Sequence, residues 1–236
     1  MSFYIGIDLG TSSVKAVLIS ETGEIIKNES IVYKTISDET GLSEIDPEIW
    51  FESTVKCLEN LTKDEKNISA IGVTGQMHSL AMLDSYGDVV RPVIMWNDLR
   101  ALDQASRIRK VAEDYGLYSI SKIASTGSPA ANLLFVRENE PDIFKRISKI
   151  LIGHDYLGYR LTGHVGADLC EASTSALYDL KNRRWSPEIL DYIGIDEFVM
   201  PEIVPSCCCV GKLRDEICCR LGLDGAPDVA EGTGDN

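Results

Sequence analysis

The sequence predicts an α/β fold in which a mixed sheet is flanked by helices. Residues 3–33 consist of β-branched, apolar runs separated by turns, a pattern typical of a strand meander. Asp46-Pro47 then marks a helix start, and further apolar strands precede a mostly helical region from Arg100 onward. Elements with one apolar face bury it by packing in layers, so this order favours a sheet covered by helices.

The first strands are expected at residues 3–8, 15–20 and 25–33. Gly10 and three hydroxyl residues separate the first two strands, and a turn at residues 21–24 contains Gly23. Both connections are short, so consecutive strands are expected to pair in an antiparallel manner.

A helix is expected to begin at Pro47, with Asp46 as its N-cap, because proline suits the first helical position and a carboxylate accepts the free N–H groups. Residues 50, 57, 58 and 61 continue it with apolar side chains at helical spacing. Strands are expected next at residues 68–74, 80–83 and 93–95, with a turn at residues 86–88.

The rest of the chain is expected to be mainly helical. Predicted helices cover residues 102–112, 132–138, 154–161, 187–192 and 212–221. Val229-Ala230 then leads into a terminal turn at residues 232–236. No internal repeat, low-complexity stretch or linker divides the chain.

Composition and charge narrow the classes of partner. The chain has 236 residues, 44% of them hydrophobic, and 37 acidic against 23 basic residues give a net charge of −14. This balance disfavours nucleic acid and anionic membrane as partners, although a local donor site can still bind a small phosphate. No apolar run approaches the roughly 20 residues of a membrane span. We expect a cytoplasmic protein, since Asp8 stands too early for a secretory signal.

Seven cysteines raise the question of a metal or redox site. Five of them cluster at residues 207–209 and 218–219, but no Cys-x-x-Cys pair or nearby histidine completes a tetrahedral set. Neighbouring residues of a strand point to opposite faces, so the triplet cannot present its thiolates together without a bend. Reduced thiols that pack a strand and a helix are expected, with a metal or redox role as the alternative.

The segment after the first strand has the composition of a phosphate-binding turn. Gly10 allows a phosphate to approach the backbone, and the hydroxyl groups of Thr11, Ser12 and Ser13 add donors. Asp8, at the rim, is a candidate ligand for Mg²⁺, directly or through water. An ordinary hairpin turn with Asp8 as its cap is the competing interpretation.

This opening resembles the first phosphate loop of the actin-like ATPase superfamily. Together with the motifs at residues 75–78, 96–100 and 234–236, the whole chain resembles the FGGY family of carbohydrate kinases, and within it the group that phosphorylates the ketopentose D-xylulose. The resemblance implies a ribonuclease-H-like lobe with a helical insertion from Leu99 to about Trp185. It also implies that residues 1–236 are the N-terminal, sugar-binding lobe, that the adenosine-binding lobe is absent, and that this lobe alone is inactive. The implied ligands are a sugar, ATP and Mg²⁺, and a homodimer is left open.

The resemblance also implies a role for each motif residue. Asp235 corresponds to the general base, which accepts the proton of the attacking sugar hydroxyl. Asp8 corresponds to the metal–phosphate ligand. Seven residues are candidates for sugar contacts, either by correspondence to the family or by their chemistry: Gln76, Met77, His78, Trp96, Asn97, Asp98 and Asn236. Taken singly, His78 and Trp96 also fit ordinary core positions. We expect Asp8, Thr11, His78, Asp98 and Asp235 to line one cleft, because ligands bind beyond the strand ends of open α/β sheets.

The sequence departs from the family pattern in places. Asn132 and Phe135 stand where a lysine and a tryptophan are usual, and Gly153-His154 replaces a Pro-Lys pair. Met77-His78 argues against glycerol, whose kinases carry Gln-Arg there. A gluconokinase or another FGGY sugar kinase is the alternative enzyme, and a non-catalytic sugar-binding module is the alternative from a different class.

Overall fold

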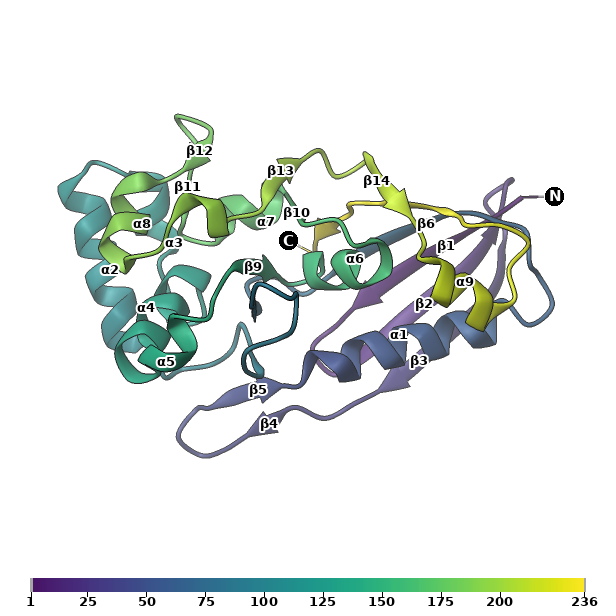
Figure 1. The fold of residues 1–236 in the computed structure, drawn as a ribbon, viewed down its shortest axis with the longest axis horizontal. Coiled ribbons are helices and arrows are strands. Elements are labelled where there is room, and N and C mark those ends of the chain that lie inside the picture. Colours follow the sequence, from purple (N-terminus) through teal and green to yellow (C-terminus); the bar gives the residue numbers. More distant parts are fainter. Residues whose placement is uncertain (1, 236) are drawn as a thin grey trace.

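The computed structural model describes residues 2–235. Figure 1 shows an elongated molecule with a large sheet at one end and a helical region at the other. Each part has its own hydrophobic core, one around Ile7, Leu58 and Ile71 and one around Leu134 and Ile189. The arrangement confirms the predicted mixed α/β class.

The large sheet has the strand order β14-β15-β6-β1-β2-β3, with β16 pairing with β6 beside it. Strand β1 pairs antiparallel with β2 and parallel with β6, while β16 pairs parallel with β6. The carboxyl ends of β1, β6 and β16 therefore meet at one edge of the sheet. The bounds are β1 Phe3–Leu9, β2 Ser13–Ser20, β3 Ile25–Val32, β6 Ile68–Gly75, β14 Cys209–Lys212, β15 Asp228–Ala230 and β16 Thr233–Gly234.

Alternate side chains of β1 point into the core between the sheet and its covering helices. Phe3, Ile5, Ile7 and Leu9 are buried, and helices α1 (Pro47–Leu61), α6 (Asp155–Thr162) and α9 (Asp215–Leu221) cover this core. The start of α1 is as predicted, since the Asp46 side chain accepts a hydrogen bond from the Glu48 N–H at 2.9 Å.

The second core lies within the long segment between β6 and β14. It is built from α2 (Leu102–Asp114), α3 (Tyr118–Ile123), α4 (Pro129–Asn139), α5 (Pro141–Phe144) and α8 (Pro187–Ile193). They pack beside a sheet ordered β4-β5-β8-β7-β9, made of Ile36–Ser37, Ser43–Ile45, Val93–Ile94, Leu80–Leu83 and Lys149–Ile152. The predicted helical insertion is present, but its core also takes in Leu80 and Met200 and so extends beyond residues 99–185.

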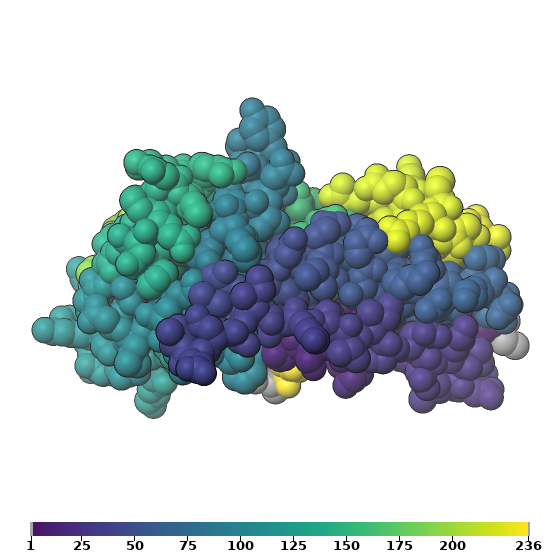
Figure 2. Space-filling model, turned by 90° about the horizontal axis from the view of Figure 1, so that it is seen from below, coloured from purple at the N-terminus to yellow at the C-terminus, as the bar shows by residue number. Residues whose placement is uncertain are grey.

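Several short elements complete the chain. Strand β10 (Gly166–Asp168) pairs with β13 (Glu202–Val204), and β11 (Tyr178–Asp179) pairs with β12 (Arg184–Trp185). Helix α7 (Leu169–Thr174) follows β10 directly, and a 3-10 turn covers Glu197–Val199. Figure 2 shows a small group of yellow atoms from the C-terminal end beside the purple N-terminal strands, as the pairing of β16 with β6 requires.

Some predicted bounds are wrong. Lys212 belongs to β14, and the helix predicted to start there begins at Asp215. The helix predicted from residue 132 begins at Pro129, and β9 was not anticipated. All seven cysteines are free thiols, but Cys207, Cys209 and Cys219 are exposed, so the clusters pack only in part. None of the helices described is long and apolar enough to cross a membrane.

Candidate functional site

Three segments that are distant in sequence meet at one edge of the large sheet. The turn of residues 10–13 follows β1, Gln76-Met77-His78 follows β6, and Asp235 follows β16. Backbone hydrogen bonds join them, because the Gln76 N–H donates to the Leu9 carbonyl at 2.7 Å and the Asp235 N–H donates to the Gly75 carbonyl at 3.1 Å. The parallel pairing of these strands therefore fixes the relative position of the motifs.

The turn after β1 is held by its own backbone and by Tyr33. The Gly10 N–H donates to the Ser13 carbonyl at 3.0 Å, and the Tyr33 N–H donates to the Ser12 carbonyl at 3.0 Å. The Tyr33 hydroxyl donates to the Gly10 carbonyl. Burial, together with the nearby Asp8 carboxylate, raises the pKa of Tyr33, so the hydroxyl keeps the proton that it donates.

Asp8 stands at the rim of this turn with a side chain that is 41% exposed. Its carboxylate lies 3.9 Å from the Lys15 ammonium group, since the two residues face each other across β1 and β2. An accessible carboxylate beside the hydroxyls of Thr11, Ser12 and Ser13 offers the hard oxygen ligands that Mg²⁺ prefers. These residues fit a metal–phosphate site.

His78 has an unusual backbone and a partly buried ring. Its φ angle is +68°, and its N–H donates to the Glu171 carboxyl group at 2.7 Å. Burial lowers the pKa of His78, while the nearby Asp235 carboxylate opposes that shift. The imidazole is therefore neutral near pH 7 and can both donate and accept a hydrogen bond.

Gln76 and Met77 line the same edge. The Gln76 side chain is 3% exposed, yet neither its oxygen nor its nitrogen has a hydrogen-bond partner within the part of the chain that the structure describes. Such a buried amide is costly unless something else satisfies it. Met77 packs against Gly234, where an added Cβ would lie 2.5 Å from the Met77 Cγ. Only glycine leaves room for this contact.

Trp96 lies at the surface instead of in a core, with 46% of the residue exposed. Its indole N–H donates to the Thr11 hydroxyl at 3.0 Å, and its backbone N–H donates to the Ser79 hydroxyl at 3.3 Å. Asn97 beside it is exposed. Trp96 therefore connects the turn after β1 with the segment that carries His78.

Asp98 does not join the site. It is fully buried, and its carboxylate accepts hydrogen bonds from the Ser43 N–H at 2.7 Å and the Arg100 N–H at 2.9 Å, besides an ion pair with the Arg100 guanidinium group at 2.8 Å. Of the residues expected to line one cleft, the structure brings Asp8, Thr11, His78 and Asp235 to one edge, while these bonds direct Asp98 into the loop. Asn236 lies outside the described residues.

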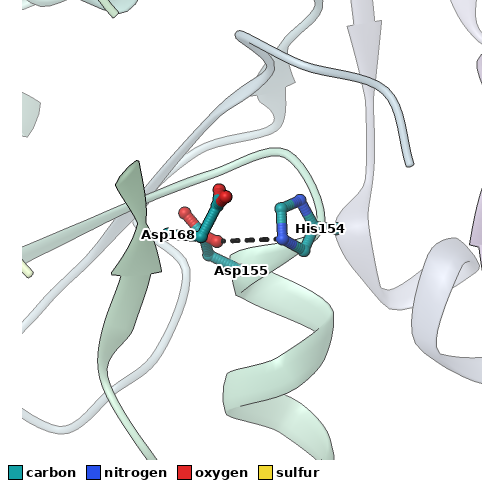
Figure 3. A group of neighbouring side chains, drawn as sticks. All are labelled: His154, Asp155 and Asp168. Carbon is teal, nitrogen blue, oxygen red and sulfur yellow. Dashed lines mark ion pairs between the residues drawn. The ribbon is translucent and has the colours of Figure 1, made fainter. Parts of the chain in front are cut away.

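A buried acidic cluster lies behind this edge and was not anticipated. It consists of His154, Asp155, Asp168, Glu171 and Glu231, each almost fully buried. Figure 3 shows His154 and Asp155 at the start of α6 and Asp168 at the end of β10. Burial raises the pKa of Glu171 to about 8 and that of Glu231 to about 7, and it lowers the pKa of His154 to about 4. Nothing in the sequence indicated the cluster beyond His154, which already departed from the family pattern.

Within the cluster, His154, Asp155 and Asp168 offer ligand atoms that lie within 4.8 Å of one another. Asp168, however, already accepts hydrogen bonds from the Cys170 and Glu171 N–H groups and from the Ser206 and Thr233 hydroxyls. A cation would have to compete with these donors. Because these donors already occupy Asp168, and burial raises the pKa of Asp155 well above its usual range, the arrangement fits a metal ion poorly.

Known proteins are similar to this chain in sequence and in fold. The model of the FGGY family of carbohydrate kinases, N-terminal domain, matches residues 3–236. A xylulose kinase from Staphylococcus xylosus is 33% identical over 100% of this chain and 50% of its own length. The solved structure of a "xyloylose kinase" from Brucella ovis is 36% identical, with a TM-score of 0.92 over 99% of this chain and 49% of that one. A gluconate kinase structure from Lactobacillus acidophilus is 28% identical, with a TM-score of 0.88 over 99% of this chain and 48% of that one. The chain spans about half the length of the relatives it matches.

Proposed function

The chain belongs to the FGGY family of carbohydrate kinases, and from that premise we propose that the complete protein containing it transfers the γ-phosphoryl group of ATP to D-xylulose. The product is D-xylulose 5-phosphate. Residues 1–236 act as the sugar-binding lobe, and the adenosine is held by the part of the family's length that this chain does not span. The lobe alone does not turn over ATP.

One observation carries this proposal: Asp235 and the neutral His78 stand at the same sheet edge as Asp8 and the hydroxyl-rich turn. Phosphoryl transfer depends on positioning a hydroxyl group in line with the γ-phosphorus and on stabilising charge around the phosphoryl group. A carboxylate and a hydroxyl-rich turn at one edge of the sheet support this reaction, because they can serve as the base and the phosphate site.

Asp235 acts as the general base. Its side chain is exposed at the end of β16, so a bound sugar hydroxyl can reach it. As that hydroxyl attacks, its proton passes to the Asp235 carboxylate, the new O–P bond forms, and ADP leaves with the electrons of the broken P–O bond.

The sugar is oriented by the side chains around this base. Neutral His78 and the unpaired amide of Gln76 supply hydrogen bonds in both senses. Asn97 adds a further polar contact, and the exposed Trp96 ring offers an apolar face to the C–H groups of the sugar.

The phosphates lie against the turn after β1. The hydroxyls of Thr11, Ser12 and Ser13 donate to phosphate oxygens, and Asp8 holds the Mg²⁺ that accompanies ATP, directly or through water. When bound, that ion supplies charge neutralisation for the triphosphate. Lys15, paired with Asp8 across the hairpin, is close enough to add a positive charge at the rim.

The likeness to a gluconate kinase makes gluconate the second candidate. Gluconate carries a carboxylate, which needs a cationic partner. The side chains gathered at the sugar end are Gln76, Met77, His78, Trp96 and Asp235, and burial keeps the only potential cation among them, His78, neutral. An uncharged ketose fits this set better, because Asp235 would repel a second carboxylate.

The test is a substrate comparison in the complete protein with ATP and Mg²⁺. D-Xylulose, D-gluconate and glycerol are offered separately, ADP release is followed, and the product is identified by ³¹P and ¹³C NMR. We expect kcat/KM for D-xylulose to exceed that for the others by at least about a hundredfold. Faster turnover of gluconate would make the protein a gluconokinase, and binding of D-xylulose without turnover would make it a sugar-binding module.

A further inference from the structure

The first turn of α7 is bonded to both halves of the sugar site. Asp168, the N-cap of α7, accepts a hydrogen bond from the Thr233 hydroxyl at 2.9 Å, close to Asp235 in the chain. Glu171, three residues later, accepts the His78 N–H at 2.7 Å. One helix end therefore holds the segment with the base and the segment with the sugar-binding histidine.

The hydrogen bond from the His78 N–H to Glu171 holds an unfavourable backbone conformation in place. A φ of +68° is unfavourable for a residue with a side chain and persists only where surrounding contacts impose it. Glu171 is fully buried, so no water replaces its carboxyl oxygen if that oxygen is removed. The direction of the His78 ring thus depends on an acceptor at position 171.

Glu171 also lies against the strand that carries Asp235. Its second carboxyl oxygen would be 3.0 Å from a Cβ placed on Gly234 and 3.2 Å from one placed on Gly153. The same oxygen lies 3.8 Å from the His154 Nδ1 and has no hydrogen-bond partner within residues 2–235. Glu171 therefore fills the junction between His78, Gly234 and the buried cluster.

We propose that Glu171 is a positioning residue for the sugar: without touching substrate, its carboxyl group fixes the backbone of His78 and thereby the direction of its ring at the sheet edge. This inference rests on the proposed function. The acceptor is needed whether or not the carboxyl group carries a proton, so an amide in its place should serve equally well.

The experiment compares Glu171→Gln with Glu171→Met in the complete protein. Both side chains have the length of glutamate, but only glutamine keeps an acceptor for the His78 N–H. Asp179→Asn is the control, because Asp179 is also a buried carboxylate that accepts backbone N–H groups, at Lys181 and Asn182, and it has no bond to the site. Steady-state constants for D-xylulose and ATP are measured with hydrogen–deuterium exchange of the peptide around His78.

We expect Glu171→Met to raise the KM for D-xylulose by roughly tenfold to a hundredfold, the usual cost of an unpaired buried donor, while the KM for ATP stays unchanged. Exchange around His78 should become faster. Glu171→Gln and Asp179→Asn should stay within about threefold of the wild type in every constant. An unchanged KM for D-xylulose in the methionine variant, or an equal loss in the glutamine variant, would overturn the proposal.

Two other results also bear on the proposal: misfolding of Glu171→Met, and a wild type without activity on D-xylulose. If Glu171→Met does not fold, Glu171→Ala makes the same comparison, and failure of both to fold while Glu171→Gln folds would show a purely structural role and reject positioning. If the wild type does not phosphorylate D-xylulose, the proposed function fails. The exchange rate around His78 still tests the link to Glu171, because it requires no substrate.

Discussion

Replacing Gly234 with alanine tests the packing that sets Asp235 against His78. The added Cβ would lie 2.5 Å from the Met77 Cγ and 2.8 Å from its Sδ, well inside the ordinary carbon contact of about 3.5–4.0 Å. Met77 is buried, so either its side chain or strand β16 must shift by about 1 Å.

The cost follows from that shift. Overpacking of a buried site usually destabilises by about 1–3 kcal/mol, which lowers the thermal midpoint of a domain of this size by roughly 2–12 °C. Because Asp235 is the next residue, we also expect kcat to fall by at least about tenfold, since a base displaced by about 1 Å no longer meets its hydroxyl group.

Gly72→Ala is the matched control, because Gly72 lies on the neighbouring strand β6 and a Cβ there would meet nothing within 4 Å. Calorimetric midpoints and D-xylulose turnover are compared for the two variants in the complete protein. Equal midpoints and equal kcat for Gly234→Ala and Gly72→Ala would refute the packing described for Met77 and Gly234.

Three other predictions address the sugar, the loop and the cluster. His78→Ala should weaken D-xylulose binding strongly and nucleotide binding little by calorimetry, because a hydrogen-bonding site leaves groups unpaired when one partner is removed; equal losses would indicate a structural role. Asp98→Asn should lower the free energy of unfolding by about 1–3 kcal/mol in a urea titration without changing sugar specificity, since the Asp98 carboxylate pairs with Arg100 and Ser43. A change in specificity would indicate that Asp98 contacts the sugar. Folding raises the pKa of Glu171 from 4.5 to about 8, so its contribution to stability is lost as pH rises through that interval. The thermal midpoint of Glu171→Gln should therefore fall less between pH 5 and 8 than that of the wild type. The same pH dependence of the midpoint in both proteins would contradict the raised pKa of Glu171.

The sequence predicted those elements that neighbouring residues determine. Asp46 and Pro47 specify a helix start by themselves, and the alternation of apolar residues in β1 decides which of its side chains are buried. The turn of residues 10–13 and His78 could be placed because each follows a recognisable strand, whereas Asp235 follows β16, a strand within a segment that was predicted to be a turn. Their shared edge then results from parallel pairing.

The remainder depends on contacts between distant residues. Asp98 has the right chemistry for a sugar ligand, but the Ser43 N–H, more than fifty positions away, occupies its carboxylate. Glu171 looks like an ordinary helical glutamate until the fold places the His78 N–H against it. The buried cluster was missed for the same reason, because nothing near His154 or Asp155 in the sequence indicates that both become enclosed.

The role of Asp235 is the central claim, and Asp235→Asn tests it most directly. The asparagine keeps the backbone bond to Gly75 and changes an exposed side chain, so the thermal midpoint should stay the same. The amide cannot accept the proton, so kcat for D-xylulose should fall by about 10²- to 10⁴-fold, nearer the lower figure if the transition state is loose, while the KM for the sugar moves far less. An unchanged kcat together with a lowered midpoint, measured on the same preparation, would contradict the assignment of Asp235 as the general base.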